Sequence, residues 1–141
     1  MFIKYICKMQ KVTMKCLLID DDADDQYFFK LALNALEANV ELSRASSGVE
    51  AFDQLTAFYI PDCIFLDLNM PKMNGREFLK KIKNIDIFKD VPVLIYSTSA
   101  DAKDKTDMIL LGATQFITKT NSIGELTSIL KKEFAKISVS R

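Results

Sequence analysis

The stretch CIFLDLNMP at residues 63–71 decides the fold, because a short apolar run there ends in one carboxylate, Asp67, and soon afterwards in Pro71. Four apolar or sulfur-bearing side chains in a row are typical of a strand buried on both faces, as in the middle of a parallel sheet. Pro71 prevents the strand from continuing, because proline has no backbone N–H to donate. We therefore expect Asp67 to lie where open α/β sheets hold their ligands, at the carboxyl end of a central strand.

A second stretch strengthens this interpretation. Residues 15–19 (KCLLI) form another buried-strand pattern and lead directly into Asp20, Asp21 and Asp22. Carboxylates clustered at one sheet edge repel one another, so each resists ionisation unless a cation neutralises them. An all-oxygen site with room for water and phosphate suits Mg²⁺. The two strands together predict a cation site.

Composition limits the class of protein. The chain has 141 residues, of which 49% are hydrophobic, so we expect one compact domain. Nineteen acidic residues balance nineteen basic ones, so no overall charge favours nucleic acid, and no apolar run is long enough for a membrane span. The chain has no histidine. The absence of histidine therefore excludes His-ligated zinc and histidine-based catalysis. Any phosphohistidine must belong to a partner.

Cysteine usage and the start of the chain complete the general picture. Two of the three cysteines, Cys16 and Cys63, fall in predicted core strands, so we interpret the thiols as reduced packing residues of a cytoplasmic protein. The start of the chain lacks a signal-peptide pattern. Residues 1–13 show no clear period and are expected to form a flexible arm, followed by a single domain at 14–141.

Predicted strands and helices alternate along the rest of the chain. Helix signals include a capping box at residues 47–50, a capping Asn74 and a terminating Gly112. The first helix is expected to turn Phe28, Leu31, Ala32, Ala35 and Leu36 toward the core. The strands are expected near 15–20, 40–45, 63–67, 93–97 and 114–118, and the helices near 26–38, 48–60, 74–84, 101–111 and 122–137. This (βα)5 pattern predicts a doubly wound α/β fold with a five-stranded parallel sheet.

The predicted carboxyl ends of the strands carry a chemically coherent set of side chains. Asp20 and Asp21 follow the first strand, Asp67 the third, Ser97 ends the fourth, and Lys119 follows the fifth. A hydroxyl and an ammonium can hold the oxygens of an incoming phosphoryl group. An aspartate placed among them can act as a nucleophile that forms an acyl phosphate.

Four motifs in this order resemble the receiver domains of two-component response regulators. They are LIDDD at 18–22, LDLNMPKMNG at 66–75, PVLIYS at 92–97, and LGA at 111–113 followed by FITK at 116–119. The resemblance covers about residues 15–137 and implies the strand order 2-1-3-4-5 of the chemotaxis receiver. It also implies a signalling phosphoacceptor and not an enzyme proper.

The resemblance assigns roles to individual residues. It makes Asp67 the phosphoacceptor, with Mg²⁺ held by Asp20, Asp21, Asp67 and the backbone carbonyl of Asn69. Ser97 and Lys119 would contact the phosphoryl group, and Ser97 with Phe116 would report phosphorylation to the surface. Alternation along the fifth strand leaves open that Phe116 is permanently buried.

The expected function is that of a stand-alone receiver. It would take a phosphoryl group from a histidine kinase or a histidine phosphotransfer protein and signal to a protein target that the sequence does not identify. The proposed output face contains Ile109, which shares a helix face with Asp101 and Lys105. Activation is expected to promote partner binding or self-association as a homodimer there.

A receiver-like binding module that works without phosphorylation is the main alternative. An enzyme is a poor fit, since a related phosphatase would need an acid where Asn69 stands, and five aspartates after the first strand would repel a flavin phosphate. Asp22, Asp24 and Asp25 are interpreted as first-turn acids and not ligands. Thr120 stands where the family usually has proline, so we expect a trans bond and an altered loop there.

Overall fold

The computed structural model describes residues 13–140, without the side chains of residues 139 and 140. The predicted arm therefore lies almost entirely outside the described residues. Strands and helices alternate, as predicted. The elements are β1 (Met14–Ile19), α2 (Ala23–Asn34), β2 (Val40–Ala45), α3 (Gly48–Gln54), β3 (Cys63–Leu66), α4 (Gly75–Ile82), β4 (Val93–Ser97), α5 (Ala102–Leu110), β5 (Gln115–Thr118) and α6 (Ile123–Ser140).

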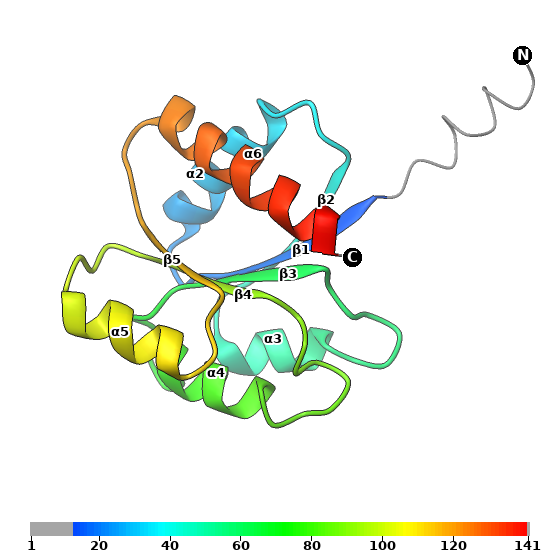
Figure 1. Ribbon diagram of the computed structural model, residues 1–141, viewed down its shortest axis with the longest axis vertical. Helices are drawn as coiled ribbons and strands as arrows, with labels where there is room; N and C mark the ends of the chain where they lie inside the picture. Colours follow the sequence, from blue (N-terminus) through cyan, green and yellow to red (C-terminus); the bar gives the residue numbers. More distant parts are fainter. Residues whose placement is uncertain (1–12, 141) are drawn as a thin grey trace, which may run out of the picture.

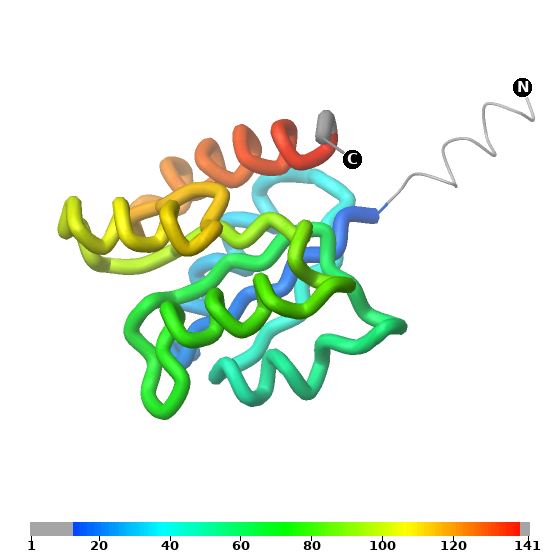
Figure 2. Tube along the Cα trace, turned by 60° about the horizontal axis from the view of Figure 1, so that its bottom comes forward, coloured from blue at the N-terminus to red at the C-terminus, as the bar shows by residue number. Residues whose placement is uncertain are grey.

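The five strands form one parallel sheet in the order β2-β1-β3-β4-β5, which confirms the predicted topology. Helices α2 and α6 cover one face, and α3, α4 and α5 cover the other (Figure 1). In Figure 2 the face covered by α3, α4 and α5 is turned forward, and α3 and α4 lie side by side on it. No helix in the described part of the chain is long and apolar enough to cross a membrane.

The central strands are buried on both faces, as the apolar runs predict. Leu17, Ile64 and Ile95 belong to the core beneath α3, α4 and α5. Their neighbours Leu18 and Phe65 point the other way, into the core beneath α2 and α6. Because successive side chains of a strand alternate between faces, one short strand serves two cores.

The two cysteines of the described chain behave as the sequence predicts. Cys16 and Cys63 are free, fully buried and opposite each other in the β1–β3 register. Burial, followed by the neighbouring Cys63 thiol, raises the pKa of the Cys16 thiol well above its usual value. A thiol that stays protonated is a poor nucleophile, so this one acts as a packing residue.

The predicted start of the first helix was wrong, and its predicted buried face was only partly right: Ala32 is buried and Phe28 and Leu36 pack against the core, but Ala35 does not. Helix α2 begins at Ala23, three residues early, because the Asp22 carboxylate accepts hydrogen bonds from the backbone N–H groups of Asp24 and Asp25. It ends at Asn34, and Ala35 is exposed. The buried positions are Gln26, Phe29, Ala32 and Leu33. Nearly every residue from 27 to 36 is apolar, so periodicity could not select the face.

The other helix signals hold with small differences, but α3 ends at Gln54, well before the predicted end near residue 60. Ser47 Oγ accepts from Glu50 N at 3.0 Å, but the Glu50 carboxylate accepts from Ser46 N, one residue earlier than a capping box predicts. Asn74 Oδ1 accepts from Glu77 N at 2.9 Å and caps α4. Gly112 follows α5 with φ at 109°, a conformation that favours glycine.

Gly75 fixes how closely α4 approaches the end of β3. A Cβ at this position would collide with the carbonyl oxygen of Asp67 and lie 2.9 Å from Leu68 Cα. We expect Gly75→Ala to lower the free energy of unfolding by about 1–3 kcal/mol, because backbone must shift to admit the methyl group. Urea unfolding followed by circular dichroism measures it.

Gly124→Ala is the matched control. Its Cβ would meet only Ser122 Oγ, at 3.9 Å, in the first turn of α6. This variant should gain about 0.5–1 kcal/mol from higher helix propensity. Equal stability changes in the two variants would show that Gly75 does not limit how closely α4 approaches the end of β3.

Candidate functional site

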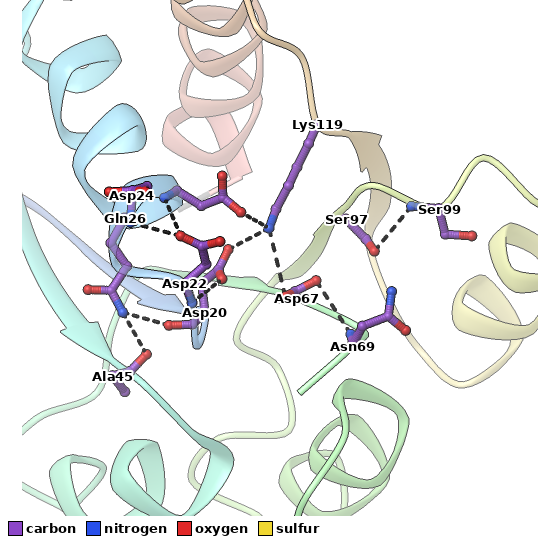
Figure 3. A network of polar contacts seen from close by, with 11 residues as sticks. Asp20, Asp22, Asp24, Gln26, Ala45, Asp67, Asn69, Ser97, Ser99 and Lys119 are labelled. Carbon is purple, nitrogen blue, oxygen red and sulfur yellow. Dashed lines mark hydrogen bonds and ion pairs between the residues drawn. The ribbon is translucent and has the colours of Figure 1, made fainter. Parts of the chain in front are cut away.

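Parallel strands bring the predicted site residues to one edge of the sheet. Asp20 and Asp67 are the first residues after β1 and β3, and Ile19 and Leu66 before them are register partners. Ser97 ends β4, and Lys119 follows β5. Figure 3 shows Asp20, Asp67 and Lys119 converging, with Ser97 on the far side of Asp67.

Three carboxylates form an oxygen-rich cluster at this edge. Asp20, Asp21 and Asp67 each offer one oxygen, and these three atoms all lie within 4.8 Å of one another. Asp20 is fully buried, Asp67 nearly so, and Asp21 is exposed. Hard oxygen donors at such spacing, open to water through Asp21, fit a divalent cation such as Mg²⁺.

Electrostatics around Asp67 make its ionised form costly. Burial raises the pKa of its carboxyl to about 6, and the charges of Asp20 and Asp21 add to the rise, whereas Lys119 opposes it. Burial also raises the pKa of Asp20 despite its hydrogen bond from Lys119. A bound cation would offset this cost, so the raised pKa values of Asp67 and Asp20 favour a cation site, as the three oxygen donors do.

Lys119 supplies the positive charge. Its Nζ lies 2.7 Å from Asp20 Oδ2, 2.8 Å from Asp25 Oδ2 and 3.7 Å from Asp67 Oδ2, and 5.4 Å from the centre of the Tyr96 ring. Burial alone lowers its pKa, but the hydrogen bonds to Asp20 and Asp25 outweigh burial and hold the pKa above its usual value. The ammonium is therefore charged throughout the physiological range.

Asp25 is the site residue that sequence reasoning missed. The sequence assigned Asp25 only the role of a first-turn acid, with no partner for its carboxylate. Because α2 begins at Ala23, Asp25 occupies the third helical position and its carboxylate reaches Lys119. The sequence interpretation of Asp25 as a first-turn acid is confirmed, but that interpretation did not include its contact with Lys119. Asp24, its neighbour, agrees with the predicted first-turn role.

Ser97 connects the site to the neighbouring helices. It is fully buried, and its Oγ accepts from Ser99 N at 3.4 Å. Ser99 Oγ donates to Asp104 of α5 at 2.8 Å, and Asp104 pairs with Arg76 of α4 at 3.7 Å. A movement of Ser97 therefore has a polar path toward both helices.

The loops after β3 and β5 carry the remaining predicted residues. Asn69 is exposed, and its backbone N–H donates to Asp67 Oδ1 at 3.4 Å. The bond between Lys119 and Thr120 is trans, as predicted, since the described residues contain no cis peptide bond. Thr120 Oγ1 donates to Glu125 and accepts from Ser122 N, which ties the loop to the first turn of α6.

The predicted output residues lie away from the carboxylates. Ile109 is 47% exposed, while Met108 is buried and Leu111 partly buried. Phe116 is half-buried against the core beneath α5, so it is not fully enclosed. Lys105 Nζ lies 5.8 Å from the centre of its ring, a contact the sequence did not suggest.

Comparison with known proteins identifies the family. Residues 16–131 match the response regulator receiver domain. The chain is 31% identical over 117 residues to the sensor histidine kinase CheAY of Helicobacter pylori, covering 82% of this chain and 14% of that protein. It is 29% identical to the chemotaxis protein CheY1 of the same species, covering 75% of this chain and 85% of CheY1.

A solved structure agrees with these relatives. The phosphorylated cyanobacterial phytochrome response regulator RcpA superposes with a TM-score of 0.75 at 31% identity, covering 86% of this chain and 91% of RcpA. The chain belongs to the response regulator receiver family. Such domains take part in phosphorylation-based two-component signalling, bind Mg²⁺ at an acidic pocket, and interact with histidine kinases or phosphotransfer proteins.

The raised pKa of Asp67 predicts how stability of the metal-free protein depends on pH. The folded pKa of about 6 exceeds the ordinary 3.8, so the protonated form stabilises the fold below pH 3.8, and this contribution is lost as pH rises through 6. Asp67→Asn should therefore be more stable than wild type by about 1–2 kcal/mol at pH 7.5, with the difference vanishing near pH 4.

Denaturant unfolding with a chelator, repeated from pH 4 to 8, measures this difference. Asp86→Asn, at an exposed loop position, is the control and should change stability by less than about 0.5 kcal/mol at every pH. A wild type that is more stable than Asp67→Asn at pH 7.5 would contradict the claim that the ionised Asp67 carboxylate destabilises the metal-free fold.

Proposed function

We propose that Asp67 is the phosphoacceptor of this chain. Its carboxylate is 8% exposed at the mouth of the sheet, with one cationic side chain at 3.7 Å and two further carboxylates beside it. That arrangement is the observation that carries the proposal. One Asp67 oxygen attacks the donor's phosphorus, the bond from phosphorus to the leaving group breaks, and the leaving group keeps that electron pair. The product is an aspartyl acyl phosphate.

The neighbouring side chains have separate roles in this transfer. Lys119 can pair with a phosphoryl oxygen, and the Ser97 hydroxyl can donate to another. Asp20, Asp21 and Asp67, together with the backbone carbonyl of Asn69, would hold Mg²⁺. When bound, Mg²⁺ supplies positive charge that neutralises the transferring phosphoryl group.

The phosphoryl donor is proposed to be a phosphohistidine or a small acyl phosphate. Because the sequence contains no histidine, a phosphohistidine donor has to come from a histidine kinase or a phosphotransfer partner. The similarity to the kinase CheAY and to CheY1 supports this partner class. That the chain works as a stand-alone receiver stays a prediction.

Acetyl phosphate tests the proposal without a partner. With Mg²⁺, the intact mass should increase by one phosphate, and hydroxylamine should remove it because acyl phosphates are labile to nucleophiles. Asp67→Asn and chelation should each abolish the increase. Phosphate retained by the Asn variant would contradict the acceptor assignment, and an unmodified wild type would favour the module that works without phosphorylation.

We further propose that the signal leaves through α5 and β5. Phosphorylation would draw Ser97 toward the phosphoryl group, and the hydrogen bonds through Ser99 would pass that movement to α5. The half-buried Phe116 ring can then move inward, which changes the apolar surface beside Ile109. The Lys105 contact helps to hold the ring in its present position.

Ile109→Lys tests this face. Beryllofluoride with Mg²⁺ should promote association of wild type with itself or with a partner, and the variant should lose roughly tenfold in affinity, since a charge replaces an anchoring aliphatic group. Analytical ultracentrifugation and pull-down measure this. Ile87→Lys, 51% exposed in the α4–β4 loop, is the matched control. Association lost equally in both variants, or in neither, would move the output surface elsewhere.

A further inference from the structure

Lys119 is hydrogen-bonded to two carboxylates, and neither belongs to the proposed acceptor. Its Nζ lies 2.7 Å from Asp20 and 2.8 Å from Asp25, both within hydrogen-bonding distance. The distance of 3.7 Å to Asp67 is too long for a hydrogen bond. In Figure 3 the Lys119 side chain descends from the end of β5, and its ammonium lies between the start of α2 and Asp67.

The two partners of Lys119 differ in what losing it would cost. Asp20 has a fully buried side chain, so losing Lys119 would leave an uncompensated charge in the metal-free site, whereas Mg²⁺ held by Asp20 would offset that loss. The Asp25 side chain is 38% exposed, so water can replace the ammonium there at little cost. A phosphoryl group that draws Lys119 toward Asp67 therefore competes with Asp25, which lies outside the proposed Mg²⁺ ligands and has only water to replace the ammonium.

We propose that Asp25 is a positioning residue that holds Lys119 on the α2 side of the site and competes with the phosphoryl group for it. This inference rests on the proposed phosphorylation of Asp67. In the unphosphorylated protein the Asp25 pair stabilises the resting position of Lys119. Transfer to Asp67 then includes the loss of this pair, so Asp25 slows phosphorylation and sets the resting state of the site.

The chain provides a close control in Asp24. Asp24 lies in the same first turn of α2, carries the same charge and is exposed, but it forms no ion pair with Lys119 in the described part of the chain. Asp24→Asn and Asp25→Asn therefore change the net charge equally. Any difference between them measures the contact with Lys119 and not the general field around the site.

The experiment compares rates of Asp67 phosphorylation by acetyl phosphate with Mg²⁺ in the full chain, followed by intact mass. We expect Asp25→Asn to react roughly two- to fivefold faster than Asp24→Asn, the range for a partly exposed ion pair. Asp25→Glu keeps a carboxylate and should return the rate toward wild type. Side-chain ¹⁵N spectra should show the Lys119 Nζ resonance shifted by Asp25→Asn and unchanged by Asp24→Asn.

Each outcome decides one claim. Equal rates and unshifted Lys119 resonances in the two Asn variants would overturn the positioning role while leaving phosphorylation of Asp67 intact. A slower Asp25→Asn variant with a shifted resonance would also overturn it, because Asp25 would then aid transfer. A wild type that accepts no phosphate would contradict the proposed function itself, and the Lys119 spectra would still report on the contact.

Discussion

The site depends on the ion pairs of the Lys119 ammonium, because its one positive charge compensates carboxylates from three different parts of the fold. Asp20 comes from the end of β1, Asp25 from α2 and Asp67 from the end of β3. Without that charge, the buried Asp20 would be an unpaired anion in the interior, which is strongly destabilising. The same charge is what an incoming phosphoryl group needs, so stability and chemistry compete for Lys119.

The sheet makes this arrangement possible. Ile19 and Leu66 are register partners, and the next residue in each strand is an aspartate. A shift of one residue in either strand would turn its side chains to the opposite faces and separate these carboxylates. The buried apolar runs that anchor the register therefore also determine the distance between Asp20 and Asp67. Gly75 keeps the following helix close to the same edge.

Much of this could be predicted from the sequence, for physical reasons. The strands were predictable because buried runs such as residues 63–66 end at acids and prolines, and parallel strands place their carboxyl ends together. The start of α2 was not, because any of several consecutive aspartates could cap a helix. The contact from Asp25 to Lys119 spans 94 residues and depends on that start, so no local pattern encodes it. The Lys105 contact with Phe116 likewise depends on how α5 packs on β5.

The central claim is that this receiver domain carries its phosphoryl group on Asp67. Borohydride reduction tests it most directly, since it converts an aspartyl acyl phosphate to homoserine and leaves free aspartate unchanged. After treatment with acetyl phosphate and Mg²⁺, peptide mass spectrometry should find homoserine at position 67 and at no other aspartate. Homoserine at Asp20 or Asp21, or its absence from protein that carries phosphate, would contradict the account.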